Sequence, residues 1–321
     1  MRYPIKHFHG IMFHHFHDGK VHKAGQGSIS TDDFIQIIKF IGRDNILDPE
    51  IFYDLLINKK LKPNQYCMTF DDGIKCQFDI ALPILEDFHI KAYFFIYTSI
   101  FTGEPDLLEV YRYFRINYFN SIQDFYDCFF SFFKNDFESF FKIHNDEIQK
   151  WKKFYPFYSD SDIKFRFIRD RYLTKEEYKK INFEIFDKMN FVPKNYYKNL
   201  FFNKKNLNDL NQAGHTIGLH THNHPTLLEN LSLDEQEKEY SENLSLLNEL
   251  LNNDYNKIDS VSHPLGSYNK DTLKILTKLK IKIGFRDNMS VDIKKDMKSI
   301  NNSNLEISRQ DHSNIMNLIK L

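Results

Sequence analysis

The sequence predicts an α/β protein built on a parallel sheet or barrel, and three observations support this. Short runs rich in β-branched and aromatic residues, such as 65–70 and 92–98, alternate with segments of helical spacing. Polar side chains follow several of these runs directly. A length of 321 residues is ordinary for one α/β barrel. We therefore expect a single barrel over residues 1–321, with an insertion.

Composition narrows the class of protein. The 43 Lys and Arg residues against 44 Asp and Glu give a formal charge of −1, so we expect no nucleic-acid partner. The first residues lack an apolar stretch of signal-peptide length, and no later run has the length of a transmembrane segment. The three cysteines fit neither a disulfide framework nor a thiolate zinc site. These features predict a cytoplasmic protein.

The first third of the chain shows the alternation of strand and helix. An apolar run near residue 11 leads into histidines and is typical of a strand that ends in polar groups. Helical spacing between 31 and 60 predicts two helices, the first capped by Thr31 with the aspartates that follow it. A buried strand at 65–70 stops at Asp71 and Asp72. A helix near 78–88 and a strand at 92–98 follow.

Residues 103–206 depart from this rhythm and predict a helical insertion. Phenylalanines recur at helical spacing through the segment, for example Phe125, Phe129 and Phe140. Apolar stripes of this kind are usually buried, so we interpret the rings as the core of the insertion. Recognition of a substrate's carrier group and homodimer formation are two roles that the insertion could have.

The α/β rhythm returns after the insertion. A helix ends at Gly214, and a strand at 215–220 leads into a polar turn. An amphipathic helix is expected over 233–251, because Ser232 and Glu235 form a typical start signal. The remaining expected strands cover 259–262, 281–285 and 305–308.

Two clusters supply what a hydrolytic metal centre needs. Asp72, His220 and His224 could provide three protein ligands and leave a position open for water, while Asp71 could act as a base. His220 and His224 share a face if the turn is helical, whereas a strand would align His222 with them. Spacing alone therefore leaves His222 as a rival ligand.

The same residues carry a resemblance to a known family. Thr-Phe-Asp-Asp-Gly at 69–73 and Gly-His-Thr-Ile-Gly-Leu-His-Thr-His-Asn-His-Pro at 214–225 resemble, in the same order, the first two motifs of the polysaccharide deacetylase family, also called NodB-type or carbohydrate esterase family four. The resemblance implies a distorted (β/α) barrel of the NodB type with fewer than eight regular strands. It also implies that Asp71 is the general base and that one divalent metal ion, with Zn²⁺ expected, is held by Asp72, His220 and His224.

The later motifs are less complete. Ser-His-Pro-Leu-Gly-Ser-Tyr at 262–268 aligns with a family motif that commonly contains arginine, which is absent here. The resemblance implies that the backbone N–H of Leu265 stabilises the oxyanion, and it brings His263 near the substrate or into the packing beside it. The family's fourth motif, with aspartate and tryptophan, is not visible.

Two further stretches complete the expected site. The resemblance implies a histidine near the last strand as general acid, and His312 is the candidate; Arg309, which we expect to hold Asp71, and Asp311 could share the missing duties. The Met-Phe-His-His stretch at 12–15 is similar to an early family stretch, which would bring His14 or His15 to the rim as a substrate-binding residue.

These expectations define a function. We expect a metal-dependent N-deacylase that releases acetate or formate from an N-acylated amino sugar. A cytoplasmic enzyme would meet this sugar linked to a nucleotide or a lipid during the synthesis of surface glycans such as lipopolysaccharide or capsule. Hydrolysis of a non-sugar amide is the enzymatic alternative, and a catalytically silent carbohydrate-binding barrel is the non-enzymatic one.

Overall fold

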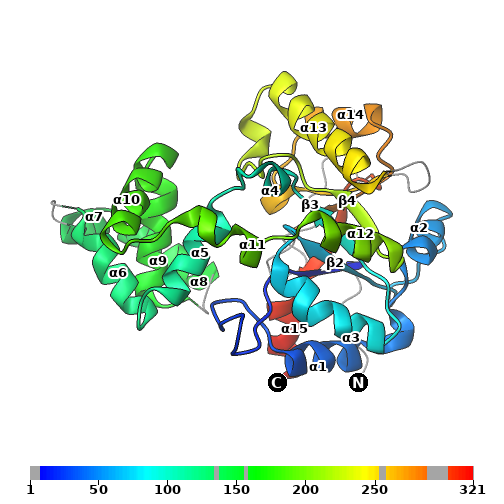
Figure 1. The fold of residues 1–321 in the computed structure, drawn as a ribbon, viewed down its shortest axis with the longest axis horizontal. Helices are drawn as coiled ribbons and strands as arrows, with labels where there is room; N and C mark the ends of the chain where they lie inside the picture. Colours follow the sequence, from blue (N-terminus) through cyan, green and yellow to red (C-terminus); the bar gives the residue numbers. More distant parts are fainter. Residues whose placement is uncertain (1–7, 134–136, 155–157, 253–257, 288–302, 321) are drawn as a thin grey trace. The chain divides into compact units, whose positions relative to one another are not determined.

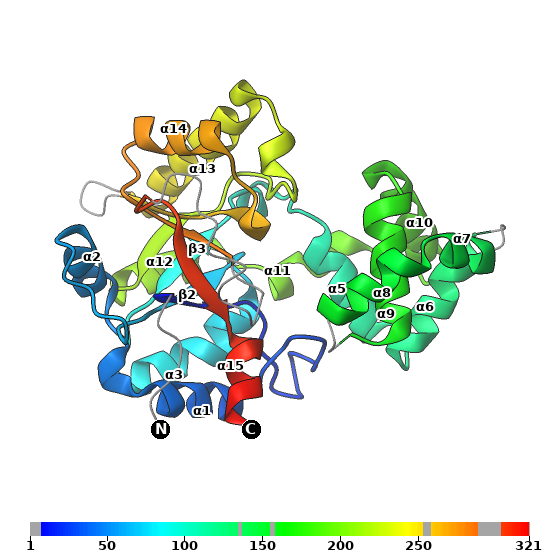
Figure 2. The same ribbon diagram turned by 180° about the vertical axis from the view of Figure 1, so that it is seen from behind.

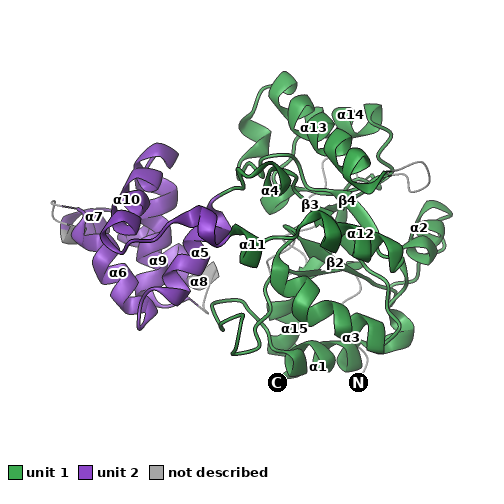
Figure 3. Ribbon diagram, in the orientation of Figure 1, with its two compact units in different colours: residues 1–106, 197–321 green, residues 107–196 purple. Residues whose placement is uncertain are grey.

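A computed structural model describes residues 8–133, 137–154, 158–252, 258–287 and 303–320. The chain forms two compact units, coloured separately in Figure 3. The first unit contains residues 1–106 and 197–321, and the second contains residues 107–196. The sequence-based range for the insertion is 103–206, whereas the structure assigns 103–106 and 197–206 to the first unit. Each unit is described by itself.

The first unit is a closed barrel of seven parallel strands (Figures 1 and 2). Their order around the barrel follows the chain: β1 (Gly10–Phe13), β2 (Cys67–Asp71), β3 (Tyr93–Ile96), β4 (Thr216–Leu219), β5 (Ser260–Ser262), β6 (Ile283–Arg286) and β7 (Ile307–Asp311). Pairing of Gly10 with Arg309 joins β1 to β7 and closes the ring. The prediction of a barrel with fewer than eight strands is confirmed.

Helices cover the outside of the barrel, because their apolar faces pack on the outward residues of the strands. The α-helices described in this unit are α1 (Thr31–Ile41), α2 (Pro49–Ile57), α3 (Leu82–Asp87), α4 (Ser99–Thr102), α11 (Tyr197–Leu200), α12 (Lys204–Gln212), α13 (Leu233–Leu251), α14 (Lys270–Lys278) and α15 (His312–Ile319). Phe34 and Ile38 of α1 are buried in the same outer core as Phe13 and Phe70 of the strands. The expected start of α13 is a capping box between Ser232 and Glu235.

A second, smaller core fills the inside of the barrel. Strand side chains alternate between the two faces, so every second residue points inward. Cys67, Tyr93, Phe95, Phe285 and Ile307 form this inner cluster, and Phe52 of α2 packs against it. The barrel is therefore filled with side chains, and α2 contributes to the filling.

Gly10 of β1 makes room for a charge inside this core. A Cβ atom added at Gly10 would lie 2.6 Å from Cγ of Arg309, which is far too close for two carbon atoms. The Arg309 side chain is fully buried and runs across this position. The absence of a side chain at residue 10 thus allows an arginine to reach the functional end of the barrel from inside.

The second unit is helical. It consists of α5 (Leu108–Asn117), α6 (Ile122–Ser131), α7 (Phe137–Ile143), α8 (Asn145–Phe154), α9 (Asp160–Phe167), the π-helix η3 (Ile168–Tyr172), α10 (Lys175–Lys188) and the short 3₁₀ helix η4 (Pro193–Asn195). Phe125, Phe129 and Phe165 are buried together, with ring centroids 4.9 to 5.9 Å apart. Rings at helical spacing therefore form the core of this unit. Among the described residues, no helix has both the length and the apolar character needed to cross a membrane.

Candidate metal centre

Polar side chains gather at the carboxyl end of the barrel because of strand alternation. On β2 the inward series runs through Cys67 and Thr69 to Asp71, and on β7 it runs through Ile307 to Arg309. The apolar residues of these inward series fill the interior of the barrel, and the polar residues follow at the carboxyl ends of the strands. This end is where barrel enzymes carry their active sites.

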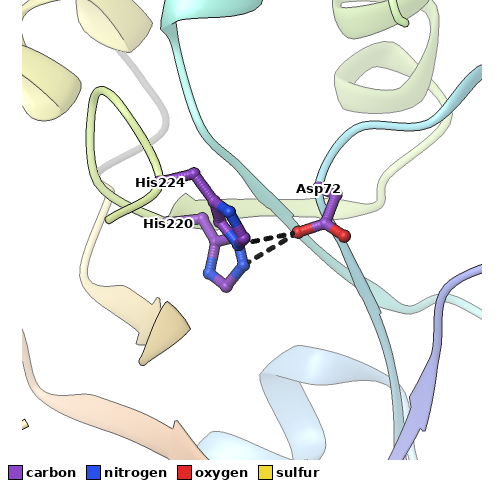
Figure 4. A group of neighbouring side chains, drawn as sticks. All are labelled: Asp72, His220 and His224. Carbon is purple, nitrogen blue, oxygen red and sulfur yellow. Dashed lines mark hydrogen bonds and ion pairs between the residues drawn. The ribbon is translucent and has the colours of Figure 1, made fainter. Parts of the chain in front are cut away.

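Asp72, His220 and His224 form a compact group at this end (Figure 4). One ligand atom from each lies within 4.8 Å of the other two, and all three residues are buried. Nε2 of His220 is 3.1 Å from Oδ1 of Asp72, and Nε2 of His224 is 3.3 Å from the same oxygen. His222 lies outside the group, because its Nδ1 is 2.9 Å from Oγ1 of Thr98.

The backbone takes uncommon conformations to bring these side chains together. Asp72, Thr221 and His224 have positive φ angles of 76°, 66° and 55°, a region that residues other than glycine rarely occupy. The loop is held by hydrogen bonds: the His224 N–H donates to Thr221 Oγ1 at 3.1 Å. Because the turn at 221–224 is neither helix nor strand, His222 faces away while His220 and His224 converge.

Asn243 of α13 fixes the position of His220. Its Oδ1 accepts the His220 N–H at 2.9 Å, and its Nδ2 donates to the Ile96 carbonyl at 2.9 Å. The side chain is fully buried. Asn243 therefore ties the ends of β3 and β4 together from the outer layer.

The donor set suits a cation. Nδ1 of His220 lies 2.9 Å from the Ser262 carbonyl and donates to it, so Nε2 is the ring atom directed at Asp72 Oδ1, 3.1 Å away. A histidine whose Nδ1 is held by a carbonyl in this way can present Nε2 to a metal ion bound beside the carboxylate. Two imidazoles with one carboxylate also form a common protein ligand set for catalytic zinc.

The pKa values of Asp72 and His224 are shifted by their mutual contact. Burial alone would raise the pKa of the Asp72 carboxyl, but the imidazoles of His224 and His220 outweigh it and hold the pKa well below its usual value. Burial would lower the pKa of His224, yet the Asp72 carboxylate outweighs burial and raises it to about 9. The carboxylate and the imidazoles therefore stabilise each other's charged forms, and a bound cation would take the place of the proton on His224.

Asp71 lies beside this group in a separate network. Arg309 donates from Nη1 to Asp71 Oδ1 at 2.8 Å, and its Nη2 lies 2.7 Å from Oδ2. Nη2 also donates to Asp287 Oδ1 at 2.7 Å, and Ser262 Oγ donates to Asp71 Oδ2 at 3.0 Å. Although burial opposes it, the Arg309 guanidinium lowers the pKa of Asp71. Asp71 is thus an ionised, oriented carboxylate next to the imidazole group.

Comparisons with known proteins agree with this site. A profile described as "Polysaccharide deacetylase" matches residues 169–284. Over these residues the chain is similar to the polysaccharide deacetylase family. Members of this family are hydrolases of amide bonds, and they are in general metal-dependent. Among curated proteins, no sequence matches the chain.

Three solved structures share the fold of this chain at low sequence identity. The chain is similar to the Streptococcus pyogenes deacetylase PplD in complex with acetate, at 19% identity and a TM-score of 0.54 over 98% of each chain. IcaB from Ammonifex degensii gives 13% identity and a TM-score of 0.54 over 98% of each chain. A de-N-acetylase from Aggregatibacter actinomycetemcomitans gives 13% and 0.52, over 96% of this chain and 98% of that one.

His14, directly after β1, faces the carboxylates of Asp71 and Asp72. Its Nε2 is 3.9 Å from Asp71 Oδ2 and 3.9 Å from Asp72 Oδ2, and its side chain is 25% exposed. Burial would lower the pKa of His14, but Asp72 and Asp71 outweigh it and raise the pKa. The neighbouring His15 ring lies with its centroid 6.0 Å from that of His14.

His312 does not reach the site, contrary to the sequence-based assignment as general acid. Arg309 points into the barrel, so alternation turns His312 to the outer layer, where its ring stacks on Phe13 at 5.7 Å. Its Nδ1 and Nε2 lie 3.3 Å from the Met12 carbonyl and 3.0 Å from the Gly27 carbonyl. A ring enclosed in this way has no nitrogen directed at a substrate.

His263 is also directed away from the barrel end. The assignment of His263 as a substrate-binding residue is therefore corrected. It follows the inward Ser262 and is fully buried, with Nε2 donating to the Leu305 carbonyl at 2.8 Å and its ring stacked on Tyr268. Burial lowers the pKa of His263 to about 4. His263 is therefore a neutral packing residue.

The other two candidates lie near the barrel end. Leu265 has a positive φ of 51° and is 54% exposed, next to the buried Pro264. Asp311 caps α15, because its Oδ1 accepts the Ser313 N–H at 2.8 Å. Its charge acts on His14, but one carboxylate oxygen is already engaged in this cap.

Three functional neighbours were not predicted from the sequence. Asp287, Ser262 and Asn243 hold Arg309, Asp71 and His220 respectively. Asp287 follows β6 with no recognisable motif around it. The available signal was alternation: a residue two positions after the inward Phe285 also points inward.

Proposed function

We propose that this chain is a polysaccharide deacetylase that removes the N-acyl group of an N-acylated amino sugar with the help of one divalent metal ion. The observation that carries the proposal is the pairing of the buried Asp72, His220 and His224 group with the separate ionised carboxylate of Asp71. A metal-assisted amide hydrolase needs these two parts, because ligand and base must be different groups.

Asp72, His220 and His224 would hold the ion, and Zn²⁺ is the expected one. A bound Zn²⁺ supplies Lewis acidity and lowers the pKa of a coordinated water toward about 7. The hydrogen bond from His220 Nδ1 to Ser262 supports this role, since metal-binding histidines commonly donate their second ring nitrogen to such an acceptor.

Asp71 takes the proton of the attacking water. Arg309 and Ser262 keep its carboxylate ionised and fixed, which a general base requires. The backbone N–H of Leu265 stabilises the negative charge that develops on the amide oxygen. Main-chain donors serve this purpose irrespective of side chain, which agrees with the exposed leucine at this position.

His14 gives a proton to the leaving amine in place of His312. Its Nε2 is equidistant from the two carboxylates, and its partial exposure allows contact with a substrate that enters from outside. His14 follows β1, whereas His220 and His224 follow β4, so the donor and two of the ligands come from different strands of the barrel end.

The substrate class rests on the family together with one structural point. The missing arginine of the third motif and the absent fourth motif were the reasons to consider a non-sugar amide, and Arg309 supplies a guanidinium next to Asp71 from another strand. The grouped Asp72, His220 and His224 beside Asp71 support an active enzyme over a silent binding barrel. A nucleotide- or lipid-linked sugar, a role in lipopolysaccharide or capsule synthesis, a cytoplasmic location and a homodimer through 103–206 remain predictions.

The test is acyl release by protein loaded with one equivalent of Zn²⁺. Acetate and formate are measured against nucleotide-linked N-acyl sugars, N-acetylated oligosaccharides and non-sugar acetamides. We expect release from a sugar, and a loss of about 10²- to 10⁴-fold in Asp71→Asn with the metal retained. Asp234→Asn, on the exposed first turn of α13, is the matched control. Near-full activity of Asp71→Asn would refute the base, and release from the acetamides alone would establish the alternative substrate.

A further inference from the structure

The helical unit contains a cavity of its own. Its volume is about 670 Å³, and its lining includes His144, Glu147, Trp151 and Arg171. All lining residues lie between 143 and 171, within the second unit, so the cavity is distinct from the carboxylate and imidazole groups of the barrel (Figure 3). Small-molecule sites in proteins commonly have volumes of about 300–1,000 Å³.

Helix α8 forms much of the lining. Asp146, Glu147, Lys150 and Trp151 line the cavity at spacings that place them on one side of the helix. Ile148, on another side, is buried in a small cluster with residues of α9. The helix is thus anchored by its apolar side and presents a mixed polar and aromatic side to the cavity.

Trp151 is held by the core while it lines the cavity. Its ring meets Phe167 edge to face, with centroids 5.4 Å apart at 74°. Phe167 itself is buried and packs with Ile148 and Ile163. An indole anchored in this way offers a rigid, flat apolar surface to a ligand, with little conformational entropy to lose on binding.

The charges around the cavity balance. Asp146 and Glu147 supply two negative charges, and Lys150 and Arg171 supply two positive ones. Arg171 Nε lies 3.5 Å from Glu147 Oε1 in an ion pair whose side chains are both more than 40% exposed. A lining without net charge does not concentrate phosphate or other polyanions. It offers both hydrogen-bond donors and acceptors, which suits a neutral ligand rich in hydroxyl groups.

We propose that this cavity binds a neutral oligosaccharide. A pyranose ring combines a C–H face, which packs on an indole, with a rim of hydroxyls, which pair with carboxylates, ammonium and guanidinium groups. Trp151 provides the flat surface, and the four charged side chains provide the pairing groups. The choice of an N-acetylated sugar as the probe rests on the proposed function, whereas the binding itself does not.

The sequence offers a direct readout, because Trp151 is the single tryptophan of the chain. Tryptophan emission of the full-length protein is followed during titration with tri-N-acetylchitotriose and, separately, with cellotriose. We expect a saturable change with the first or with both. Asp146→Asn should weaken binding about tenfold, the loss expected for one charged hydrogen bond. Asp187→Asn, on the exposed side of α10 in the same unit, is the matched control and should leave binding unchanged.

The titration is repeated with Asp71→Asn, which lacks the proposed base in the barrel. Unchanged sugar binding in this variant shows that the cavity is independent of hydrolysis. No saturable change with either trisaccharide at up to about 10 mM, which covers weak single-site ligands, overturns the inference and leaves the proposed function intact. A saturable change with inorganic pyrophosphate but with neither sugar also overturns it. Sugar binding to the cavity together with no acyl release from any sugar of the hydrolysis test refutes the proposed function and leaves this inference intact.

Discussion

Arg309 Nη2 lies 2.7 Å from Asp71 Oδ2, and both side chains are buried at the carboxyl end of the barrel. The contact joins β2 to β7, two strands that each pair with β1 from opposite sides. Asp287, directly after β6, binds the same guanidinium. One arginine therefore sets the charge and orientation of the carboxylate beside the metal ligands.

Replacing Arg309 should move the pH dependence of the reaction. Asp71 must be ionised to accept a proton, and the Arg309 guanidinium lowers the pKa of Asp71. In Arg309→Lys the looser ammonium lowers it less, so the acid limb of kcat/KM shifts to higher pH. Lysine is preferred to alanine, because removing one partner of a buried pair costs about 3–5 kcal/mol of stability. Arg286→Lys is the control, because the Nε of Arg286 donates to the Glu306 carbonyl and not to Asp71. An unshifted acid limb in Arg309→Lys would contradict the role of Arg309 in lowering the pKa of Asp71.

Metal content should separate the ligands from the neighbouring histidine. His220→Ala and His224→Ala each remove one of the three proposed metal ligands. Loss of a residue that only supports a ligand lowers metal affinity about 10-fold or more, so we expect at least this loss of zinc affinity here. His222→Ala removes a ring that pairs with Thr98 and should keep the metal. Zinc bound per chain is measured after reconstitution and dialysis. Equal metal loss in all three variants would show that the ligand assignment is wrong.

Two histidines should behave in opposite ways. His14→Gln removes the proposed proton donor, and we expect kcat to fall by about 10²-fold or more with the folded state retained. His312→Gln removes a buried ring that stacks on Phe13, so we expect a lower melting temperature with kcat little changed. Turnover and thermal unfolding are compared side by side. A strong loss of kcat in His312→Gln, with His14→Gln unaffected, would restore the assignment made from the sequence.

Stability should fall between pH 6.5 and about 4. Burial lowers the pKa of His215 and of His263 to about 4, from an ordinary value of 6.5. In this window the unfolded chain binds a proton at each site and the folded chain does not, so acid favours unfolding. Each group accounts for roughly 3 kcal/mol at most. Denaturant unfolding of the wild type and His263→Gln checks this; a slope with pH that is identical in the two proteins would exclude His263 as a source.

The sequence was sufficient for the fold because the pattern of alternating segments is strong. All seven strands were expected near their observed positions, and the barrel and the similarity to polysaccharide deacetylases followed from two motifs. Asp71 and Asp72 could be placed because a buried strand stops at them. His220 and His224 could be paired only with His222 as a rival, since the geometry of 221–224 depends on positive φ angles that spacing does not reveal.

The last strands were harder because motif similarity does not say which face a residue occupies. The sequence placed Arg309, Asp311 and His312 at one strand end, but His312 points outward. His263 follows Ser262 in the same way and lies against Tyr268. Asp287 was missed because its partner, Arg309, is more than twenty residues away and no local pattern links them.

The helical unit is inserted between β3 and β4. These two strands are neighbours in the barrel, and their pairing begins with Tyr93 opposite Thr216. The whole of residues 107–196 is thus an excursion within one crossover connection. Extending such a connection costs little free energy and changes neither strand order nor register. Evolution or protein engineering can therefore exchange residues 107–196 without changing the carboxyl end of the barrel. In this architecture the chemistry of the barrel and the ligand preference of the helical unit can diverge at separate rates.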